Sequence, residues 1–113
     1  MRNPNLTKCH ARLSQILSDM GFTVYIESHF DPYYIDCYLR ELHLGFEADG
    51  DIWHSKIKDR KRDTYLLEEY DLPILRFSEK LLLAKKNEFI IKHQVMLFIE
   101  EYRGLSNGAE KFD

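Results

Sequence analysis

Acidic side chains gather on two neighbouring segments of the chain, and their types point to metal chemistry. Asp36 lies in one segment of alternating apolar and polar residues, and Glu47 and Asp49 lie in the next. Because side chains alternate between the faces of a strand, a hairpin of these segments places the three carboxylates on one face, with roughly 5–8 Å between Cβ atoms. Carboxylates bind Mg²⁺, which can activate water against a phosphoryl group. A merely solvated polar face is the alternative, and it is weakened because like charges repel.

Other polar residues could serve the same hydrolytic chemistry. His54 follows soon after Gly50, and a neutral imidazole there could accept the proton of an attacking water or contact a phosphate. An exposed loop histidine is the plainer interpretation. Asp59 and Asp63 lie one helical turn apart, and either could bind a metal or orient a base. His10, taken alone, is best interpreted as a packing histidine at the edge of an apolar helix face.

A basic run follows the acidic segments. Its five cations are Lys56, Lys58, Arg60, Lys61 and Arg62. Beside a carboxylate site they could follow a phosphate backbone, although most charge runs are solvated helix faces. The whole chain has 16 basic and 19 acidic residues and a net charge of −3, so DNA binding would depend on this local run and not on total charge.

Periodicity predicts the elements that must position these residues. Apolar residues at helical spacing predict helices over 6–20 and 88–103, and a shared face of mixed polar and apolar residues predicts another over 58–70, with a short helix after Ser78. Alternating or β-branched segments predict strands over 23–27, 34–39, 43–49 and 74–77. The order α-β-β-β-α-β-α is typical of an α/β fold in which a mixed sheet is flanked by helices.

The strand over 34–39 has a clear alternation. Ile35, Cys37 and Leu39 are expected to share one face, and Asp36 is expected on the other. The helix over 88–103 is apolar almost all round, which predicts either deep burial or a surface for a second copy or a partner subunit.

Size and composition limit the class of protein. With 113 residues, we expect a single domain over 1–103 and a frayed polar tail over 104–113. Two cysteines are too few for a disulfide scaffold, and no apolar run approaches the roughly 20 residues that span a bilayer. Residues 1–6 lack an apolar signal segment. A reduced, cytoplasmic protein without membrane contact is the expectation.

The order of the motifs resembles the very-short-patch repair endonuclease superfamily. That superfamily belongs to the restriction-endonuclease-like, or PD-(D/E)xK, nucleases and includes the EDxHD homing-endonuclease domains. The resemblance covers roughly residues 7–82 and rests on Tyr34-Ile35-Asp36, Phe46-Glu47-Ala48-Asp49-Gly50-Asp51-Ile52-Trp53-His54, Asp59-x-x-Arg62-Asp63 and Ile74-Leu75-Arg76-Phe77. It implies a restriction-endonuclease-like fold and a DNA endonuclease that depends on Mg²⁺ or Mn²⁺.

The resemblance also implies roles for individual residues. Asp36 would be the central metal ligand, and Glu47 and Asp49 would occupy the second acidic strand. The carbonyl of Ala48 could also reach the metal. His54 would handle the attacking water or the scissile phosphate.

Other positions leave alternatives open. The helical acid would be Asp59 or Asp63, and the spacing does not decide between them. Asp49 stands where these nucleases usually have a lysine. His10 stands where the first helix usually has a glutamate, so the fourth member of the site is either lost or replaced by a nitrogen ligand better suited to Mn²⁺.

The function expected from these features is metal-dependent hydrolysis of DNA phosphodiesters, by nicking or by double-strand cleavage as a dimer. A structure-selective nuclease that cuts branched junctions is one alternative. The departures at His10 and Asp49 motivate another, a catalytically silent nuclease fold that binds DNA or protein.

Overall fold

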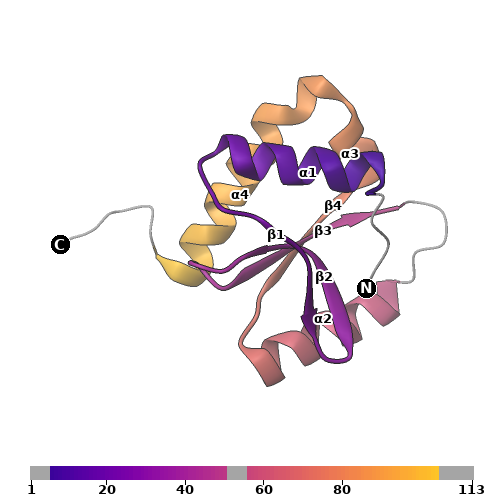
Figure 1. Cartoon of the computed structure of the whole chain (residues 1–113), viewed down its shortest axis with the longest axis vertical. Coiled ribbons are helices and arrows are strands. Elements are labelled where there is room, and N and C mark those ends of the chain that lie inside the picture. Colours follow the sequence, from indigo (N-terminus) through magenta and orange to yellow (C-terminus); the bar gives the residue numbers. More distant parts are fainter. Residues whose placement is uncertain (1–5, 51–55, 105–113) are drawn as a thin grey trace.

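A four-stranded mixed sheet forms the centre of the fold (Figure 1). The computed structural model describes residues 6–50 and 56–104. The strands lie in the order β1-β2-β3-β4, and their bounds are β1 (Tyr25–Phe30), β2 (Tyr33–Leu39), β3 (Leu44–Asp49) and β4 (Ile74–Ser78). The first three strands are antiparallel neighbours, whereas β4 runs parallel to β3. The predicted α/β class and mixed sheet are therefore confirmed.

Helices cover both faces of this sheet (Figure 1). One face carries α1 (Lys8–Asp19), α3 (Glu79–Leu83), the short 3₁₀ helix η1 (Lys85–Asn87) and α4 (Glu88–Arg103). The other face carries α2 (Lys56–Tyr70), whose Leu66 packs against Ile35. None of the helices in the described part of the chain is long and apolar enough to cross a membrane.

Local signals explain where several elements begin and end. Thr7 caps α1, because its Oγ1 accepts the main-chain N–H of His10 at 3.1 Å. Ser78 caps α3 in the same way, and α4 ends at Gly104, which adopts the left-handed conformation. The helix α2 begins two residues earlier than predicted, so it contains the whole basic run from Lys56 to Arg62.

The hairpin of β1 and β2 is longer than the sequence predicted. Its strands pair as far as Phe30 and Tyr33, so only the Asp31–Pro32 pair forms the turn. The predicted strand over 23–27 therefore lies too early, because the pairing with β2 carries β1 to residue 30. This extension brings the turn of the hairpin to the edge of the polar site described below.

One face assignment was wrong. Cys37 and Leu39 pack with α1 and α4, but Ile35 packs with Leu66 on the opposite face. The strand is irregular at this point: the register of β2 with β3 ends at Cys37 and Phe46, and the register of β1 with β2 omits Asp36 and Glu27, where Glu27 has a φ of 51°.

Gly45 shows how closely the elements approach on the α2 face. A Cβ atom at this position would lie 2.5 Å from Cδ1 of Ile74 and 3.0 Å from Cγ2 of Ile35. A larger residue would therefore require the Ile74 side chain to move and would press against Ile35.

Candidate functional site

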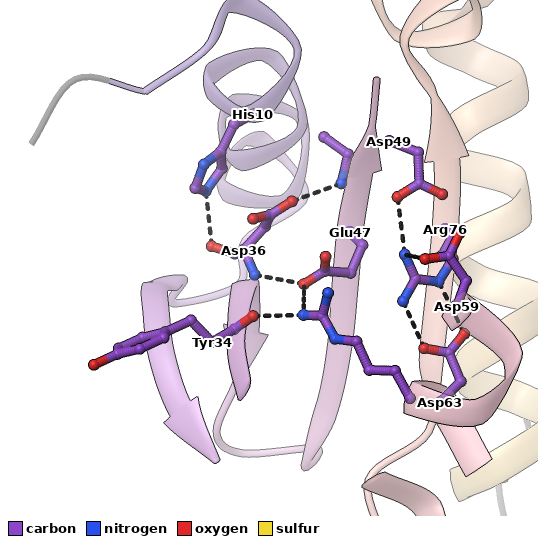
Figure 2. Close-up of polar contacts among 10 residues, drawn as sticks. His10, Tyr34, Asp36, Glu47, Asp49, Asp59, Asp63 and Arg76 are labelled. Atoms are coloured by element: carbon purple, nitrogen blue, oxygen red, sulfur yellow. Dashed lines mark hydrogen bonds and ion pairs between the residues drawn. The ribbon is translucent and has the colours of Figure 1, made fainter. Parts of the chain in front are cut away.

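The carboxylates of Asp36 and Glu47 lie between β2 and β3, where the main-chain pairing of these strands ends (Figure 2). The main-chain N–H of Asp36 donates to Oε2 of Glu47 at 2.8 Å. In return, the main-chain N–H of Ala48 donates to Oδ2 of Asp36 at 2.9 Å. Each acid therefore takes an amide hydrogen that a continuing ladder would give to a carbonyl, and the two side chains are fixed beside each other.

Glu47 is buried, which makes its negative charge unfavourable. The residue is only 5% exposed to solvent. Burial raises the pKa of Glu47 to about 7, and the negative charge of Asp36 acts in the same direction, while Arg62, the Asp36 amide and Arg76 oppose the rise. Near neutral pH, the pair of acids therefore holds either a shared proton or a concentration of negative charge that a cation would stabilise.

Arg62 reaches this pair from α2. Its Nη2 donates to the carbonyl of Tyr34 at 2.5 Å and lies 3.2 Å from Oε2 of Glu47. Its guanidinium also lies over the ring of Tyr33, 5.2 Å from the centroid. The arginine therefore links the helix to both acidic strands and fixes the orientation of Glu47.

The other members of the basic run face solvent. Lys56, Lys58, Arg60 and Lys61 are exposed on α2, whereas the side chain of Arg62 is 22% exposed. Contact of these five residues with DNA stays a prediction. The structure gives Arg62 a second role that the run alone did not reveal, which is to pair with Glu47.

Arg76 of β4 forms the centre of a second charge cluster (Figure 2). It donates from Nε and Nη2 to both carboxylate oxygens of Asp63, at 2.9 and 2.7 Å. Its Nη1 lies 2.9 Å from Asp49 and 3.6 Å from Asp59. Burial acts to lower the pKa of Arg76, but its hydrogen bonds and ion pairs raise that pKa above the ordinary value, so the guanidinium stays charged.

These contacts divide the predicted carboxylate cluster. Asp36, Glu47 and Asp49 all line one polar pocket of about 370 Å³, as expected. However, Asp49 pairs with Arg76, and only Asp36 and Glu47 face each other. Across residues 6–50 and 56–104, no three His, Cys, Asp or Glu side chains form a group that could hold a metal ion. The sequence could not predict this division, because the partner of Asp49 comes from a strand 27 residues away.

The acid pair nevertheless fits a hard divalent cation. Mg²⁺ is commonly held in proteins by one or two carboxylates, with water completing its coordination. Each carboxylate has about four lone-pair positions, so the amide hydrogen bonds to Asp36 and Glu47 leave acceptor capacity on both. The pKa of Glu47 is raised because negative charge is unfavourable in this buried site beside Asp36. A bound cation would offset that charge. Asp49 lines the same pocket, but its Oδ1 lies 2.9 Å from Nη1 of Arg76, so its role as a metal ligand stays a prediction.

His10 supports Asp36 through the main chain. Its ring is buried on α1, and Nε2 lies 2.7 Å from the carbonyl oxygen of Asp36. Because a carbonyl only accepts, Nε2 carries the proton and is not a free metal ligand. The expected nitrogen ligand is therefore not available at Nε2, and the histidine instead fixes the backbone that carries the central acid.

His54, the predicted water-handling residue, lies outside the described residues.

A smaller groove of about 350 Å³ adjoins the first pocket and is lined by Asp49, Lys56, Asp59, Arg60, Asp63 and Arg76. The two pockets share Asp49 and Arg76, so the acid pair is connected to the basic beginning of α2.

Sequence reasoning assigned no role to Arg76, although it lies in the motif Ile74-Leu75-Arg76-Phe77. The sequence does contain an indication of its role. An arginine inside a buried strand needs a carboxylate partner, since an unpaired buried charge is strongly unfavourable. The spacing of Asp59 and Asp63 on the preceding helix supplies such partners, and both of these acids contact Arg76.

Comparison with known proteins defines the class of fold. No protein-family model matches the chain, and no curated protein sequence matches it. The chain is similar to the solved structure described as the catalytic domain of the homing endonuclease I-Bth0305I, with a TM-score of 0.67 and 21% sequence identity. The match covers 87% of this chain and 99% of that chain. The fold is therefore nuclease-like, as the sequence predicted, while the closer relation to the very-short-patch or EDxHD groups stays a prediction.

Proposed function

We propose that this chain is a DNA endonuclease that depends on a divalent metal ion. The observation that carries the proposal is the pair of facing carboxylates, Asp36 and Glu47, at the wall of an open polar pocket. The likeness of the fold to a homing-endonuclease catalytic domain supports the same conclusion. Nuclease chemistry needs negative charge to hold a cation and positive charge to hold a phosphate backbone, and this surface offers both within two adjoining pockets.

Asp36 and Glu47 would hold Mg²⁺ or Mn²⁺ in this proposal. The chemistry that such a cation supplies is a lowered pKa of bound water and stabilisation of charge on the phosphoryl oxygens. Arg62 favours the ionised form of Glu47 and keeps its carboxylate oriented. His10 fixes the main chain of Asp36, so the two acids are oriented before any ligand arrives.

The remaining residues act on the substrate or on the other charges. Lys56, Lys58, Arg60 and Lys61 would bind the phosphate backbone. Arg76 offsets part of the negative charge of Asp49, Asp59 and Asp63, which would otherwise repel that backbone more strongly. His54 is proposed, from the sequence and the family resemblance alone, as the group that accepts the proton of the attacking water.

The proposal is tested with supercoiled plasmid and the purified full chain. We expect nicked or linear product in millimolar Mg²⁺ or Mn²⁺ and intact plasmid in EDTA. Calorimetric titration with each metal in the absence of DNA separates the alternatives. Metal binding without cleavage of plasmid, branched or mismatched DNA would indicate a silent module, and cleavage of branched DNA alone would indicate a junction nuclease. Rapid cleavage in EDTA would contradict the proposal.

A further inference from the structure

The outer face of α4 presents large apolar side chains to solvent. The helix packs on the sheet together with α1 and α3 through Ile91, Val95, Phe98 and Ile99 (Figure 1). Its opposite side carries Phe89, Ile90, Met96 and Leu97, which are 81%, 46%, 42% and 50% exposed. Phe89 and Met96 lie seven residues apart, as do Ile90 and Leu97, which places these four residues as one stripe on one side of the helix, with the exposed polar residues His93 and Gln94 between the two pairs. Burial of these apolar side chains against a partner would be favourable, because the isolated chain leaves them exposed to water.

Charged residues of opposite sign lie at the two ends of the stripe. Lys85 and Lys86, in η1, precede it, and Glu100 and Glu101 follow it on α4; all four residues are exposed. Along the chain, two basic residues therefore precede the stripe and two acidic residues follow it, with His93 at its middle. A surface with this order matches itself when a second copy is turned end over end.

We infer that two copies of this chain associate through α4, with the two helices antiparallel and related by a two-fold axis at His93. This register places Phe89 opposite Leu97 and Ile90 opposite Met96 of the second copy. When the same register is continued through η1, Lys86 faces Glu100 and Lys85 faces Glu101. Every apolar residue then meets an apolar residue, and both charged ends meet their opposites, which is the self-complementarity that a two-fold interface requires.

The register argues for a second copy over an unrelated partner. The helix α4 has 16 residues and is about 24 Å long. In a two-fold pair of these helices, each copy covers the apolar stripe of the other. The interface lies on the layer of α1 and α3, whereas the acid pair is reached from the pocket lined by α2 and the β1–β2 turn. The association is therefore independent of the proposed nuclease activity, and its test needs neither metal nor DNA.

Sedimentation equilibrium of the full chain tests the inference. We expect the wild-type chain to approach twice the chain mass in the micromolar range, and Leu97→Asp to raise the dimer dissociation constant at least about tenfold. The matched control is Ile26→Asp, which changes a residue of similar exposure (47%) on β1 and should leave the dimer unchanged. Circular dichroism establishes that each variant is folded.

A charge exchange tests the register itself. The double variant Lys85→Glu, Lys86→Glu places like charges at both ends of the interface and should weaken the dimer. Adding Glu100→Lys and Glu101→Lys to the same chain restores opposite charges and should recover the dimer, with an unchanged net charge. A wild-type chain that stays monomeric, an equal effect of Ile26→Asp, or no recovery in the fourfold variant would each overturn the inference.

Discussion

The main-chain amide of Asp36 donates to the carboxylate of Glu47 at 2.8 Å, across the point where β2 and β3 stop pairing. The return bond runs from the amide of Ala48 to the carboxylate of Asp36. Two acids are therefore built into the fold as hydrogen-bond acceptors. They are held close together although their charges repel, and this arrangement makes the stability of the fold sensitive to pH and to cations.

The first prediction concerns pH. The pKa of Glu47 is raised from 4.5 to about 7 by burial and by Asp36, so the folded state binds the proton more tightly than the unfolded state. The stabilisation from this proton is complete below about pH 4.5 and is lost as the pH rises through 7. Relative to Glu47→Gln, the wild type should lose roughly 2–3 kcal/mol of unfolding free energy over that range in metal-free buffer. Urea denaturation at several pH values measures it, and a difference independent of pH would contradict this account.

The second prediction concerns metal binding and needs no DNA. Because a cation would stabilise the acid pair, millimolar Mg²⁺ or Mn²⁺ should raise the melting temperature of the wild type at pH 7.5 by a few degrees. Asp36→Asn should remove this increase. Asp31→Asn is the matched control, since Asp31 lies in the turn before β2 with a side chain that is 82% exposed. Equal metal responses of both variants would show that the cation binds elsewhere.

The third prediction concerns Arg76. Replacing it with methionine keeps most of the side-chain volume but leaves Asp49, Asp59 and Asp63 without their shared cation. We expect a loss of about 3–5 kcal/mol of unfolding free energy, measured by urea denaturation. Adding Asp63→Asn should recover part of this loss, because it removes one of the charges left behind. A loss below about 1 kcal/mol would mean that the cluster does not stabilise the fold.

The fourth prediction separates two roles for His10. If Nε2 only donates to the carbonyl of Asp36, His10→Phe should lower stability by about 1–3 kcal/mol and weaken the binding of Mg²⁺ and Mn²⁺ by the same factor. A nitrogen ligand would favour Mn²⁺, so its loss would change the ratio of the two affinities. Calorimetric titration of both metals distinguishes the roles. A selective loss of Mn²⁺ binding would contradict the positioning role.

Much of the architecture follows from local sequence signals. The helical spacing of Leu13, Ile16 and Leu17 and the capping residue Thr7 define α1, and the alternation of β2 and β3 brings Asp36 to Glu47. The face of Ile35 was not predictable. Alternation assumes a regular strand, whereas β2 is irregular at Asp36, whose amide donates to the side chain of Glu47 and whose neighbour on β1, Glu27, has a positive φ.

The charge pairs of the site were harder to predict. Arg62 belongs to a run of exposed cations, and only its position on α2 shows that it turns toward Glu47. Asp49 has the spacing of a metal ligand, but it pairs with Arg76, which is close in space and distant in sequence. Periodicity identifies the face of an element, whereas long-range ion pairs depend on how complete elements pack.

The central claim is that the Asp36–Glu47 pair supports metal-dependent cleavage of DNA. Its most direct test is the rate at which Asp36→Asn and Asp31→Asn nick supercoiled plasmid in Mg²⁺, after circular dichroism has established that both variants are folded. We expect Asp31→Asn to nick at close to the wild-type rate and Asp36→Asn to be slower by at least about a thousandfold, because the loss of a metal-holding carboxylate removes several kcal/mol of transition-state stabilisation. Nicking by folded Asp36→Asn at the wild-type rate would contradict the claim.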